Sequence, residues 1–359
     1  MPNSLIAAMT FAIAALISYS TLRPLLRLSD RFGLYDQVET RRVHTIPIPR
    51  IGGLAIYLGF MIAVAVSFIL PVIRFAEEIE RILLMIVAAT IVVGVMLFDD
   101  VFGIPPLPKL LFQVGAAAIV VMPRLRDEQA GIVIENFNVP FFDTVTLPLA
   151  AAILFTLFWI VGMMNAVNWA DGLDGLAGSV TLIATLVLFL HTYFRPEGDP
   201  QFTISLLAIA LAGGILGFLP WNWHPAKIIM GDTGAMFLGF ALATISVVGG
   251  AKIATALLAL GVPILDMAWV IIYRVLNGRS PLYADRGHLH HRLLDAGLSQ
   301  PQIVGVFALL TGVFGTFALA LPTREMKLVA IIAMGLVVLA LVGLLARRQS
   351  TDRKLDEQV

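Results

Sequence analysis

The chain contains no cysteine, so disulfide bonds, thiolate catalysis and cysteine-ligated metal sites are all excluded. Charge is also scarce, because only 13% of the 359 residues are charged whereas 59% are hydrophobic. A soluble globular chain carries about 25% charged residues, so this chain has too little polar surface for water and we expect lipid to be its main solvent. The formal net charge is zero, which gives no sign of a nucleic-acid partner, and we expect none.

Long apolar runs fill most of the chain. The first follows Met1-Pro2-Asn3-Ser4, which has no basic segment, so we interpret it as a retained span rather than a cleaved signal peptide. Because a spanning helix needs about 20 apolar residues, the sequence predicts an all-α polytopic membrane protein with about eleven transmembrane helices. The predicted spans are 5–22, 51–73, 82–98, 109–123, 147–167, 173–194, 201–220, 234–250, 253–276, 301–321 and 327–346. With no internal repeat, the simplest division is one transmembrane domain, 1–346, and a charged tail, 347–359.

Basic residues are distributed unevenly between the two sets of loops. If the N-terminus lies outside, the inner loops hold about twice as many lysines and arginines as the outer loops, and such residues favour the cytoplasm. The predicted odd number of spans then places the C-terminal tail in the cytoplasm. In the longest outer loop, 124–146, apolar and polar residues alternate and predict a small hairpin.

The predicted inner loops differ from the outer loops because each carries a cluster of Asp, Asn, His, Gly or Pro residues. The first cluster is Asp99-Asp100 at the inner end of the third span, where the helix dipole disfavours negative charge. A solvated helix end would explain this pair, whereas a bound cation or an exchangeable proton would offset its charge. Lys109, at the start of the next span, is a candidate countercharge.

The second cluster follows the fifth span and repeats at every third position. Its members are Asn165, Asn168, Asp171 and Asp174, and a row of glycines has the same spacing. Residues three apart are neighbours on a helix, so a polar stripe lies beside a glycine stripe. Polar groups near lipid are costly, which favours ligand contact over a purely structural role.

The third cluster includes Asn222 and, just before the eighth span, Gly231-Asp232-Thr233-Gly234. Glycine permits a tight turn and lets a ligand approach the backbone, and the N-terminus of the next helix can face a phosphate. A simple turn with a helix cap is the alternative explanation.

The fourth cluster lies between the ninth and tenth spans and is rich in histidine. It contains Arg286, His288, His290 and His291. Neutral imidazoles bind metals, whereas charged ones bind phosphate. A structural zinc site usually needs four nitrogen or sulfur ligands at a recognisable spacing, so a diphosphate-binding loop is favoured and a plain interfacial basic loop is the alternative.

Two further places have more than one explanation. Arg42, His44 and Arg50 lie in the first inner loop, where topology alone explains much positive charge, although the Pro-Arg-Ile-Gly-Gly stretch 49–53 also shapes the backbone. Asp266 lies within the ninth span. An acid there is either a functional residue or a hydrogen-bonding residue that holds a helix in place.

Acids, basic residues and histidines gathered on one membrane face indicate a divalent cation acting on phosphate groups. Mg²⁺ takes oxygen ligands and often shares substrate phosphates, and phosphoryl transfer requires positioning and charge neutralisation rather than a thiol. A membrane location implies that one substrate is a lipid. A secondary transporter would instead place its site near the midplane between inverted repeats, and an assembly scaffold would not need so many polar residues on one side.

The combined motifs resemble those of the polyprenyl-phosphate N-acetylhexosamine-1-phosphate transferases (glycosyltransferase family 4), a superfamily that includes the phospho-MurNAc-pentapeptide translocases. The resemblance covers about residues 20 to 300. It rests on Asp99-Asp100, Asn165-x-x-Asn168-x-x-Asp171-Gly172-x-Asp174-Gly175, Met230-Gly231-Asp232-Thr233-Gly234 and His288-Leu289-His290-His291. The His-Leu-His-His-Arg and Pro-Arg-Ile-Gly-Gly forms are similar to the UDP-GlcNAc branch, which starts O-antigen, enterobacterial common antigen or teichoic-acid linkage synthesis, and the muramyl branch is the alternative.

The resemblance implies transfer of N-acetylhexosamine-1-phosphate, with GlcNAc-1-phosphate favoured, from a UDP-sugar to undecaprenyl phosphate, with release of UMP. The site would lie on the cytoplasmic face of a bacterial inner membrane, in the catalytic domain 1–346, and a homodimer is compatible with it. Asp232, with Asn168, would hold Mg²⁺, for which Mn²⁺ is an alternative. The implied catalytic residues are Asp99, Asp100 and Lys109, and the implied substrate contacts are Arg42, His44, Arg50, Asp171, Asp174, Asn222, Arg286, His288, His290 and His291.

One position departs from the family pattern. Many relatives have an aromatic residue three positions before the metal-binding aspartate, where the uracil stacks, and this chain has Ile229. If the base stacks on an aromatic ring here, the resemblance moves that role to Trp221 or Trp223.

Overall fold

The computed structural model describes residues 1–36, 47–138, 141, 144–194, 201–249, 253–280 and 287–356. In this part of the chain, 8 helices are long and apolar enough to cross a membrane. They are α1 (Asn3–Phe32), α3 (Ala76–Phe102), α4 (Pro106–Val121, continued by a 3₁₀ turn at Met122–Leu125), α5 (Leu149–Ala170), α6 (Leu176–Phe194), α7 (Phe202–Asn222), α8 (Gly231–Val248) and α12 (Gln300–Ala320). The prediction of a mostly helical polytopic membrane protein is therefore confirmed, whereas the number of spans stays a prediction.

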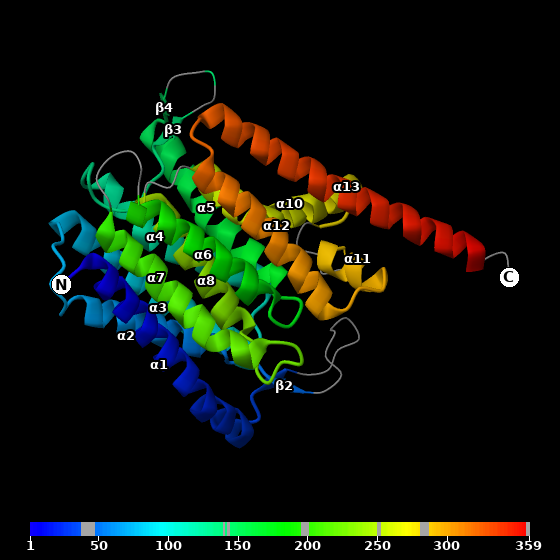
Figure 1. The fold of residues 1–359 in the computed structure, drawn as a ribbon, viewed down its shortest axis with the longest axis horizontal. Coiled ribbons are helices and arrows are strands. Elements are labelled where there is room, and N and C mark those ends of the chain that lie inside the picture. The colour runs from blue at the N-terminus through cyan, green and yellow to red at the C-terminus, as the bar shows by residue number, and fades with distance from the viewer. Residues whose placement is uncertain are drawn as a thin grey trace.

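The bundle is organised around α8, which packs against α2 (Gly53–Ser67), α3, α5, α6 and α7. The described side chains of α8 are buried almost throughout, and 83% of the residues in an apolar 18-residue stretch of α7 are buried as well. The N-terminal helix α1 and the C-terminal helix α13 (Arg324–Asp356) lie on the outside of the bundle (Figure 1). The core of the protein is therefore formed by two helices, α7 and α8, that are surrounded by other helices.

The helices that carry the polar clusters begin and end where the sequence signals it. α3 stops at Phe102 because Gly103 adopts a left-handed φ of 75°. Pro106 starts α4. Proline is tolerated at this position because the first N–H groups of a helix have no carbonyl acceptor within the helix. The connection between them is short, so the carboxylates at the end of α3 lie close to Lys109 at the start of α4.

The predicted ninth span, 253–276, is not one helix. It consists of α9 (Ile253–Ala259) and α10 (Gly261–Leu276), which separate at Leu260. Pro263 explains the break, because it has no N–H to donate to the carbonyl four residues earlier and its ring disfavours a continuous helix. The second predicted span, 51–73, is also shorter than expected, since α2 ends at Ser67 and a helix of 15 residues extends only about 22 Å.

Two short hairpins and the C-terminal helix complete the fold. β3 (Asn136–Asn138) pairs antiparallel with β4 (Thr144–Thr146), so the hairpin predicted in 124–146 is confirmed. β1 (Tyr35–Asp36) pairs with β2 (Ile48–Pro49). α13 continues past residue 346, so the backbone shows no break where the charged tail was predicted to start.

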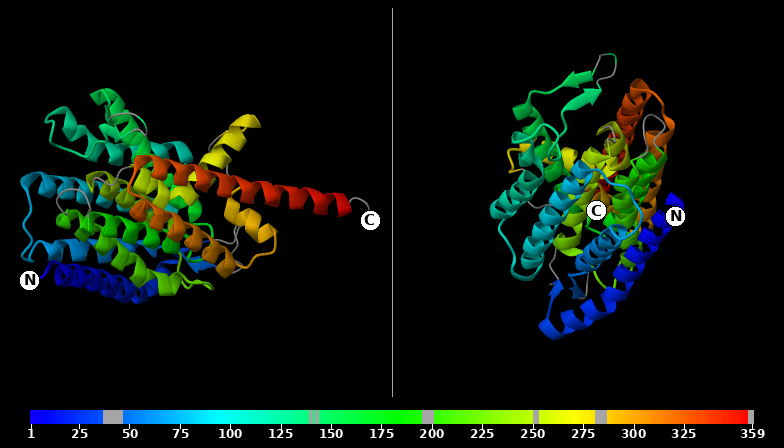
Figure 2. Two further views of the ribbon diagram at one scale, coloured as in Figure 1. Left: turned by 45° about the horizontal axis from the view of Figure 1, so that its top comes forward. Right: turned by 90° about the vertical axis from the view of Figure 1, so that its left-hand side faces the viewer.

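β2 and α11 (Leu289–Asp295) lie at the end of the bundle opposite the N-terminus (Figures 1 and 2). Six helix ends meet at this same end of the bundle and are joined by side-chain contacts. They are the C-terminal ends of α3, α5 and α7 and the N-terminal ends of α4, α6 and α8. The polar clusters, scattered over the sequence, therefore share one end of an apolar bundle.

Candidate functional site

Asp232, in the first turn of α8, lies at the centre of the polar end. Its Oδ1 accepts hydrogen bonds from Arg50 at 3.0 Å and from the Asn168 amide at 3.1 Å. Its Oδ2 contacts Lys109 Nζ. The loop before α2, the start of α4 and the end of α5 thus all converge on one carboxylate, whose side chain is 14% exposed.

Lys109 joins the first carboxylate of the Asp-Asp pair to this centre. Its Nζ lies 2.8 Å from Asp99 Oδ2 as well as in contact with Asp232. The other oxygen of Asp99 accepts a hydrogen bond from the Ile104 amide at 2.6 Å. The countercharge expected from the sequence is therefore present, and it bridges two acids rather than one.

Asp100 has a different environment from its neighbour, because its side chain is fully buried. It accepts hydrogen bonds from the backbone N–H of Asp232 at 2.9 Å, from the N–H of Thr233 at 2.9 Å and from the Thr233 hydroxyl at 2.6 Å. Arg50 Nε lies 2.9 Å away. These contacts use about the four lone-pair positions that a carboxylate offers, so Asp100 caps α8 and holds Arg50 with no acceptor capacity left over.

The backbone around Asp232 requires glycine. Gly231 has a φ of 65°, and a Cβ there would lie 2.3 Å from the Arg50 carbonyl oxygen. The stretch 49–53 is hydrogen-bonded to the stretch before α8, since Gly52 N donates to Ile229 O and Gly53 N donates to Met230 O, each at 3.0 Å. The Pro-Arg-Ile-Gly-Gly and Met-Gly-Asp-Thr-Gly motifs therefore pack side by side and are joined by backbone hydrogen bonds.

The α5–α6 turn borders this centre. Burial raises the pKa of Asp171 to about 7, against the favourable charge of Arg50 and with added repulsion from Asp100 and Asp174. Asn165, one turn of helix before Asn168, donates to Gln113 Oε1 of α4 at 2.6 Å. The residues of the predicted polar stripe therefore have different roles. Asn165 connects α5 to α4, whereas Asn168 contacts Asp232.

Asp174 and Asn222 connect the α5–α6 turn to the α7–α8 loop. Asp174 Oδ2 is 2.8 Å from His224 Nδ1 and accepts the Ala226 amide at 3.0 Å. The Asn222 amide accepts from Gly175 N and donates to Ile228 O, each at 3.0 Å, and the residue is 1% exposed. Both side chains were expected to contact substrate, and in the structure both bind protein groups.

The histidine loop, which contains His288, His290 and His291, is held by Asp266, a buried acid in α10. Asp266 Oδ2 is 2.9 Å from His288 Nδ1, and Asp266 Oδ1 accepts the Leu289 amide at 2.8 Å. The ring of His288 meets the edge of Trp169, with centroids 5.4 Å apart, at the end of α5. Asp266 thus caps the start of α11 and orients His288, which is the hydrogen-bonding role that its position in the sequence allowed.

His290 is buried against the α5–α6 turn. A Cβ at Gly172 would lie 2.2 Å from its Nε2, so any larger residue there would have to displace the imidazole. Neither ring nitrogen has a hydrogen-bond partner among the residues that the structure describes. Burial lowers the pKa of His290 well below 6.5, and the neighbouring rings of His291 and His288 lower it further. A neutral imidazole can accept one hydrogen bond from a ligand and donate another to it.

The structure therefore brings most of the predicted residues to one end of the bundle. Arg50, Asp99, Asp100, Lys109, Asn168 and Asp232 form one connected cluster. His288, His290 and His291 form a row of ring contacts beside it. The predicted contacts Arg42, His44 and Arg286 lie outside the described residues.

Three residues of this site had no individual role assigned from the sequence. Thr233 gives its hydroxyl and its N–H to Asp100, His224 pairs with Asp174, and Gln113 receives Asn165. Gln113 carried a usable signal, because an amide inside a short apolar span needs a partner. The role of His224 depends on a contact across the fold, which no local pattern encodes.

The fit to a metal ion follows from the donors around Asp232. Within the described residues, no group of three or more acids or histidines is positioned to share a metal. Mg²⁺, however, is commonly held by one or two carboxylates together with substrate phosphate oxygens. Asp232 supplies such a carboxylate, and the Asn168 amide beside it has an oxygen as well as a nitrogen. The donor set fits Mg²⁺ held partly by substrate.

Comparison with known proteins identifies similar proteins over most of the chain. The model of "Glycosyl transferase family 4" matches residues 82–250. The probable undecaprenyl-phosphate N-acetylglucosaminyl 1-phosphate transferase of Bacillus subtilis (strain 168) is 34% identical, over 91% of this chain and 88% of that protein. The decaprenyl-phosphate N-acetylglucosaminephosphotransferase of Mycobacterium tuberculosis (strain ATCC 25618 / H37Rv) is 33% identical, over 91% of this chain and 85% of that protein. The phospho-N-acetylmuramoyl-pentapeptide-transferase of Staphylococcus saprophyticus subsp. saprophyticus (strain ATCC 15305 / DSM 20229 / NCIMB 8711 / NCTC 7292 / S-41) is 32% identical, over 74% of this chain and 84% of that protein.

Asp100 is predicted to be a stability residue. Asp100→Asn puts an N–H donor where the α8 amides need an acceptor, so buried donors and Arg50 lose their partner at a cost of about 3 kcal/mol. The thermal unfolding temperature, followed by tryptophan fluorescence in detergent, should fall clearly. Glu80→Gln, which changes an exposed acid of the same helix, should leave it unchanged. Equal unfolding temperatures for Asp100→Asn and the wild type would contradict the capping role.

His290 generates a prediction about pH. Below pH 6.5 the unfolded chain takes up a proton on His290 that the folded chain does not, because the folded pKa is depressed. The contribution of His290 to the stability of the fold is therefore present above pH 6.5 and is lost progressively as the pH falls below this value. The raised pKa of Asp171 acts in the opposite direction over the same range, so the test is the difference between the two proteins. As the pH falls from about 7.5 to about 5.5, the unfolding temperature of His290→Gln should rise relative to that of the wild type at the same pH.

The control for this experiment is His191→Gln, which removes an imidazole from α6 instead. Its unfolding temperature should show the same pH dependence as the wild type. A wild-type dependence in His290→Gln would show that His290 takes up its proton equally in the folded and unfolded chains.

Proposed function

We propose that this chain, which belongs to glycosyl transferase family 4, transfers GlcNAc-1-phosphate from UDP-GlcNAc to undecaprenyl phosphate and releases UMP. The observation that carries the proposal is the cluster in which Arg50 and Lys109 bridge three carboxylates at one end of an apolar bundle. Relatives named for GlcNAc phosphate transfer to undecaprenyl and decaprenyl phosphate support the choice of sugar and lipid.

In this reaction, an oxygen of the lipid phosphate attacks the sugar-linked β-phosphorus of UDP-GlcNAc. A new P–O bond forms between the two, while the bond from that phosphorus to the oxygen shared with the α-phosphate breaks. UMP leaves with that oxygen and its electron pair, and the lipid carries a diphosphate linked to the sugar. Both reactants are anions, so catalysis depends on positioning and on neutralising charge.

Lys109 and Arg50 supply this neutralisation from the protein. Both side chains are anchored by carboxylates and only partly exposed, at 17% and 24%. Fixed cations in a partly desolvated site stabilise developing charge more than the same ions do in water. Asp232, with Asn168, would hold Mg²⁺, which when bound adds positive charge next to the phosphates.

The geometry favours different roles for the two adjacent aspartates. Asp100 has its acceptor positions filled by α8 and Arg50. Asp99 accepts hydrogen bonds only from Lys109 Nζ and from the Ile104 amide among the contacts found in the described residues. We therefore assign orientation of the lipid phosphate to Asp99 and support of the Asp232 backbone to Asp100.

The α5–α6 turn and the histidine loop are proposed to bind the UDP-sugar. Asp171 and the buried ring of His290 keep polar atoms for a ligand, whereas Asp174 and Asn222 act by holding the loops together. Trp223 is 47% exposed, and its ring faces the turn at Gly175. This exposure supports Trp223 as the platform for uracil in place of Ile229.

The proposed membrane arrangement adds three crossings to the eight apolar helices. These are α2, the α9–α10 pair and α13, which correspond to predicted spans. The N-terminus would lie outside and the tail 347–359 in the cytoplasm of a bacterial inner membrane, with the catalytic domain 1–346 exposing its site on the cytoplasmic face. The excess of basic residues in the loops at that face supports this orientation.

Two alternatives can be compared with this proposal. The muramyl-pentapeptide reaction would use the same cluster, and the Staphylococcus saprophyticus enzyme with that name aligns with 74% of this chain, compared with 91% for the Bacillus subtilis relative. A secondary transporter would carry its polar site near the middle of the membrane. Here the polar cluster forms at helix ends, which supports a surface reaction rather than transport.

The proposal predicts that detergent-purified protein releases UMP from UDP-GlcNAc only when undecaprenyl phosphate and Mg²⁺ are both present. Asp232→Asn removes the charge on which Arg50 and Lys109 converge, so UMP release should fall by about 100-fold or more. Asp127→Asn changes an exposed acid whose oxygen accepts the Gln129 amide, a contact that asparagine keeps, and should behave as the wild type.

Two outcomes would contradict this account. Full activity with unchanged Mg²⁺ dependence in Asp232→Asn would remove this carboxylate from the site. UMP release from the UDP-MurNAc-pentapeptide and not from UDP-GlcNAc would keep the chemistry and assign the muramyl reaction instead.

A further inference from the structure

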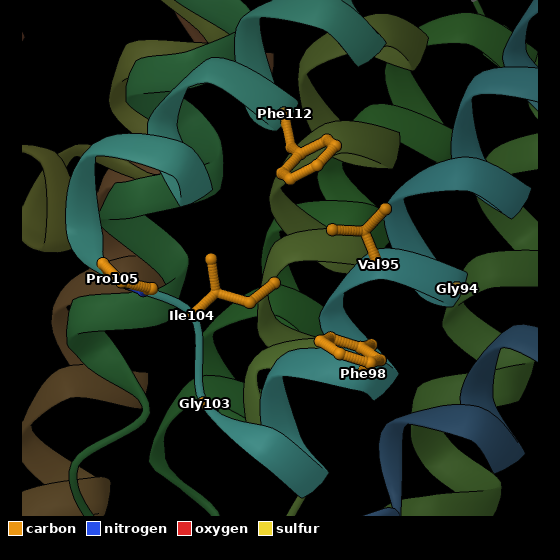
Figure 3. Close-up of a pocket in the computed structure, with 7 residues that line it drawn as sticks. All are labelled: Gly94, Val95, Phe98, Gly103, Ile104, Pro105 and Phe112. Carbon is orange, nitrogen blue, oxygen red and sulfur yellow. The ribbon is translucent and has the colours of Figure 1, made fainter.

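The hollow between α3 and α4 offers no polar side chain to a nucleotide sugar. This pocket of 470 Å³ is lined only by aliphatic, aromatic, proline and glycine residues. Figure 3 shows that side chains of α3 face those of the α3–α4 connection and of α4 across it. A nucleotide or a sugar needs polar groups that fix its orientation. The groups that could orient a UDP-sugar lie instead at the α5–α6 turn and in the histidine loop, so the support of that loop matters for the donor.

Trp169, near the end of α5, joins this helix to the histidine loop and to α10. The edge of one ring meets the face of the other where Trp169 contacts His288, with centroids 5.4 Å apart and planes at 69°. The guanidinium carbon of Arg274, a residue of α10 that is 3% exposed, lies over the Trp169 ring at 5.2 Å from its centroid. A cation over an indole is attracted by the ring, more strongly where water is excluded. The indole is therefore held by contacts with two different segments.

The residue before Trp169 belongs to the acidic cluster around Asp232. Asn168 donates to Asp232 Oδ1 at 3.1 Å, and α5 stays helical to Ala170. Neighbouring side chains leave a helix about 100° apart around its axis. One rigid turn of α5 therefore contacts the acidic cluster with one side chain and the histidine loop with the next.

Other supports of the histidine loop come from outside α5. α11 packs against α12 and α13, and His288 is held by Asp266 of α10. His290 lies against Gly172 in the α5–α6 turn, where a Cβ would be 2.2 Å from its Nε2. The rings of His288 and His290 are stacked, with centroids 5.6 Å apart and planes at 10°. A displacement of His288 would therefore also displace His290.

We propose that Trp169 is a positioning residue for the UDP-sugar, because it fixes the distance between the histidine loop and the acidic cluster around Asp232. The inference rests on the proposed function, in which both groups contact the same donor molecule. A donor held at two places binds less tightly when the distance between them is no longer fixed. The lipid phosphate is assigned to Asp99, at the end of α3, and does not depend on the loop. Loss of the indole should therefore affect the donor and spare the acceptor.

Trp169→Leu tests this role, because leucine keeps an apolar, helix-forming residue and removes the ring. In UMP-release assays it should raise KM for UDP-GlcNAc by about 10-fold and leave KM for undecaprenyl phosphate unchanged. Trp169→Phe keeps an aromatic face for Arg274 and a ring for His288, so it should restore KM for UDP-GlcNAc to within about 3-fold of the wild type. An unchanged donor KM in Trp169→Leu, or an equal rise for both substrates, would overturn the proposal.

Trp159→Leu is the matched control for lost packing. Trp159 is a buried tryptophan of the same helix, about 15 Å before Trp169 along the axis. Its replacement should lower the unfolding temperature at least as much as Trp169→Leu and leave KM for UDP-GlcNAc unchanged. A rise in donor KM of the same size in both variants would assign the effect to general weakening of α5 and would overturn the positioning role.

Donor binding can also be measured without turnover, by isothermal titration calorimetry with UDP-GlcNAc and Mg²⁺ and without lipid. The wild type and Trp159→Leu should bind with the same Kd, and the Kd of Trp169→Leu should be about 10-fold higher. In the ligand-free protein, amide hydrogen exchange in α11 should be about 10-fold faster in Trp169→Leu than in the wild type, because the loop has lost a support. Unchanged exchange in α11 would show that Trp169 does not hold the loop, and would overturn the proposal.

These measurements separate the positioning role from the proposed reaction. If no UDP-sugar supports UMP release and UDP-GlcNAc binding still depends on Trp169, the reaction fails and the positioning role stands. If UMP is released and the donor KM is insensitive to Trp169→Leu, the reaction stands and the positioning role fails. Absence of UDP-GlcNAc binding to the wild type would overturn both.

Discussion

The carboxylate of Asp100 accepts the first free N–H groups of α8, and the rest of the site depends on this contact. Asp232 lies in the first turn of this helix, and its side chain binds Arg50, Lys109 and Asn168. Arg50 is held by the same carboxylate. A single buried acid therefore fixes the start of a central helix, the loop before α2 and the position of the acid proposed to bind Mg²⁺.

The same physical arrangement recurs in the other two loops of the site. Asp174 accepts a backbone N–H of the α7–α8 loop and pairs with His224. Asp266 accepts the first N–H of α11 and pairs with His288. A buried carboxylate is costly unless hydrogen bonds and a cationic or polar partner compensate it, and each of these acids has both. They hold loops in place, which leaves Asp99, Asp171 and Asp232 as the carboxylates that we propose to lie closer to substrate.

The sequence was sufficient to predict the membrane class, the apolar helices and the motifs that meet at one end, because hydropathy and turn residues are local properties. It could not separate Asp99 from Asp100, since neighbouring residues on a helix point in different directions and only the packed α8 decides which one is capped. It could not divide the polar stripe between Asn165 and Asn168 for the same reason. The break between α9 and α10 was readable from Pro263, but an uninterrupted apolar run outweighed it.

The central claim is that Asp100 organises the site whereas Asp99 takes part in the reaction. The most direct test measures UMP release and the unfolding temperature of Asp99→Asn in one preparation. Asparagine keeps an oxygen for the Ile104 amide and loses the charge that meets Lys109. The account predicts that turnover is largely lost while the unfolding temperature stays close to that of the wild type. Normal turnover in this variant would contradict the division between the two aspartates.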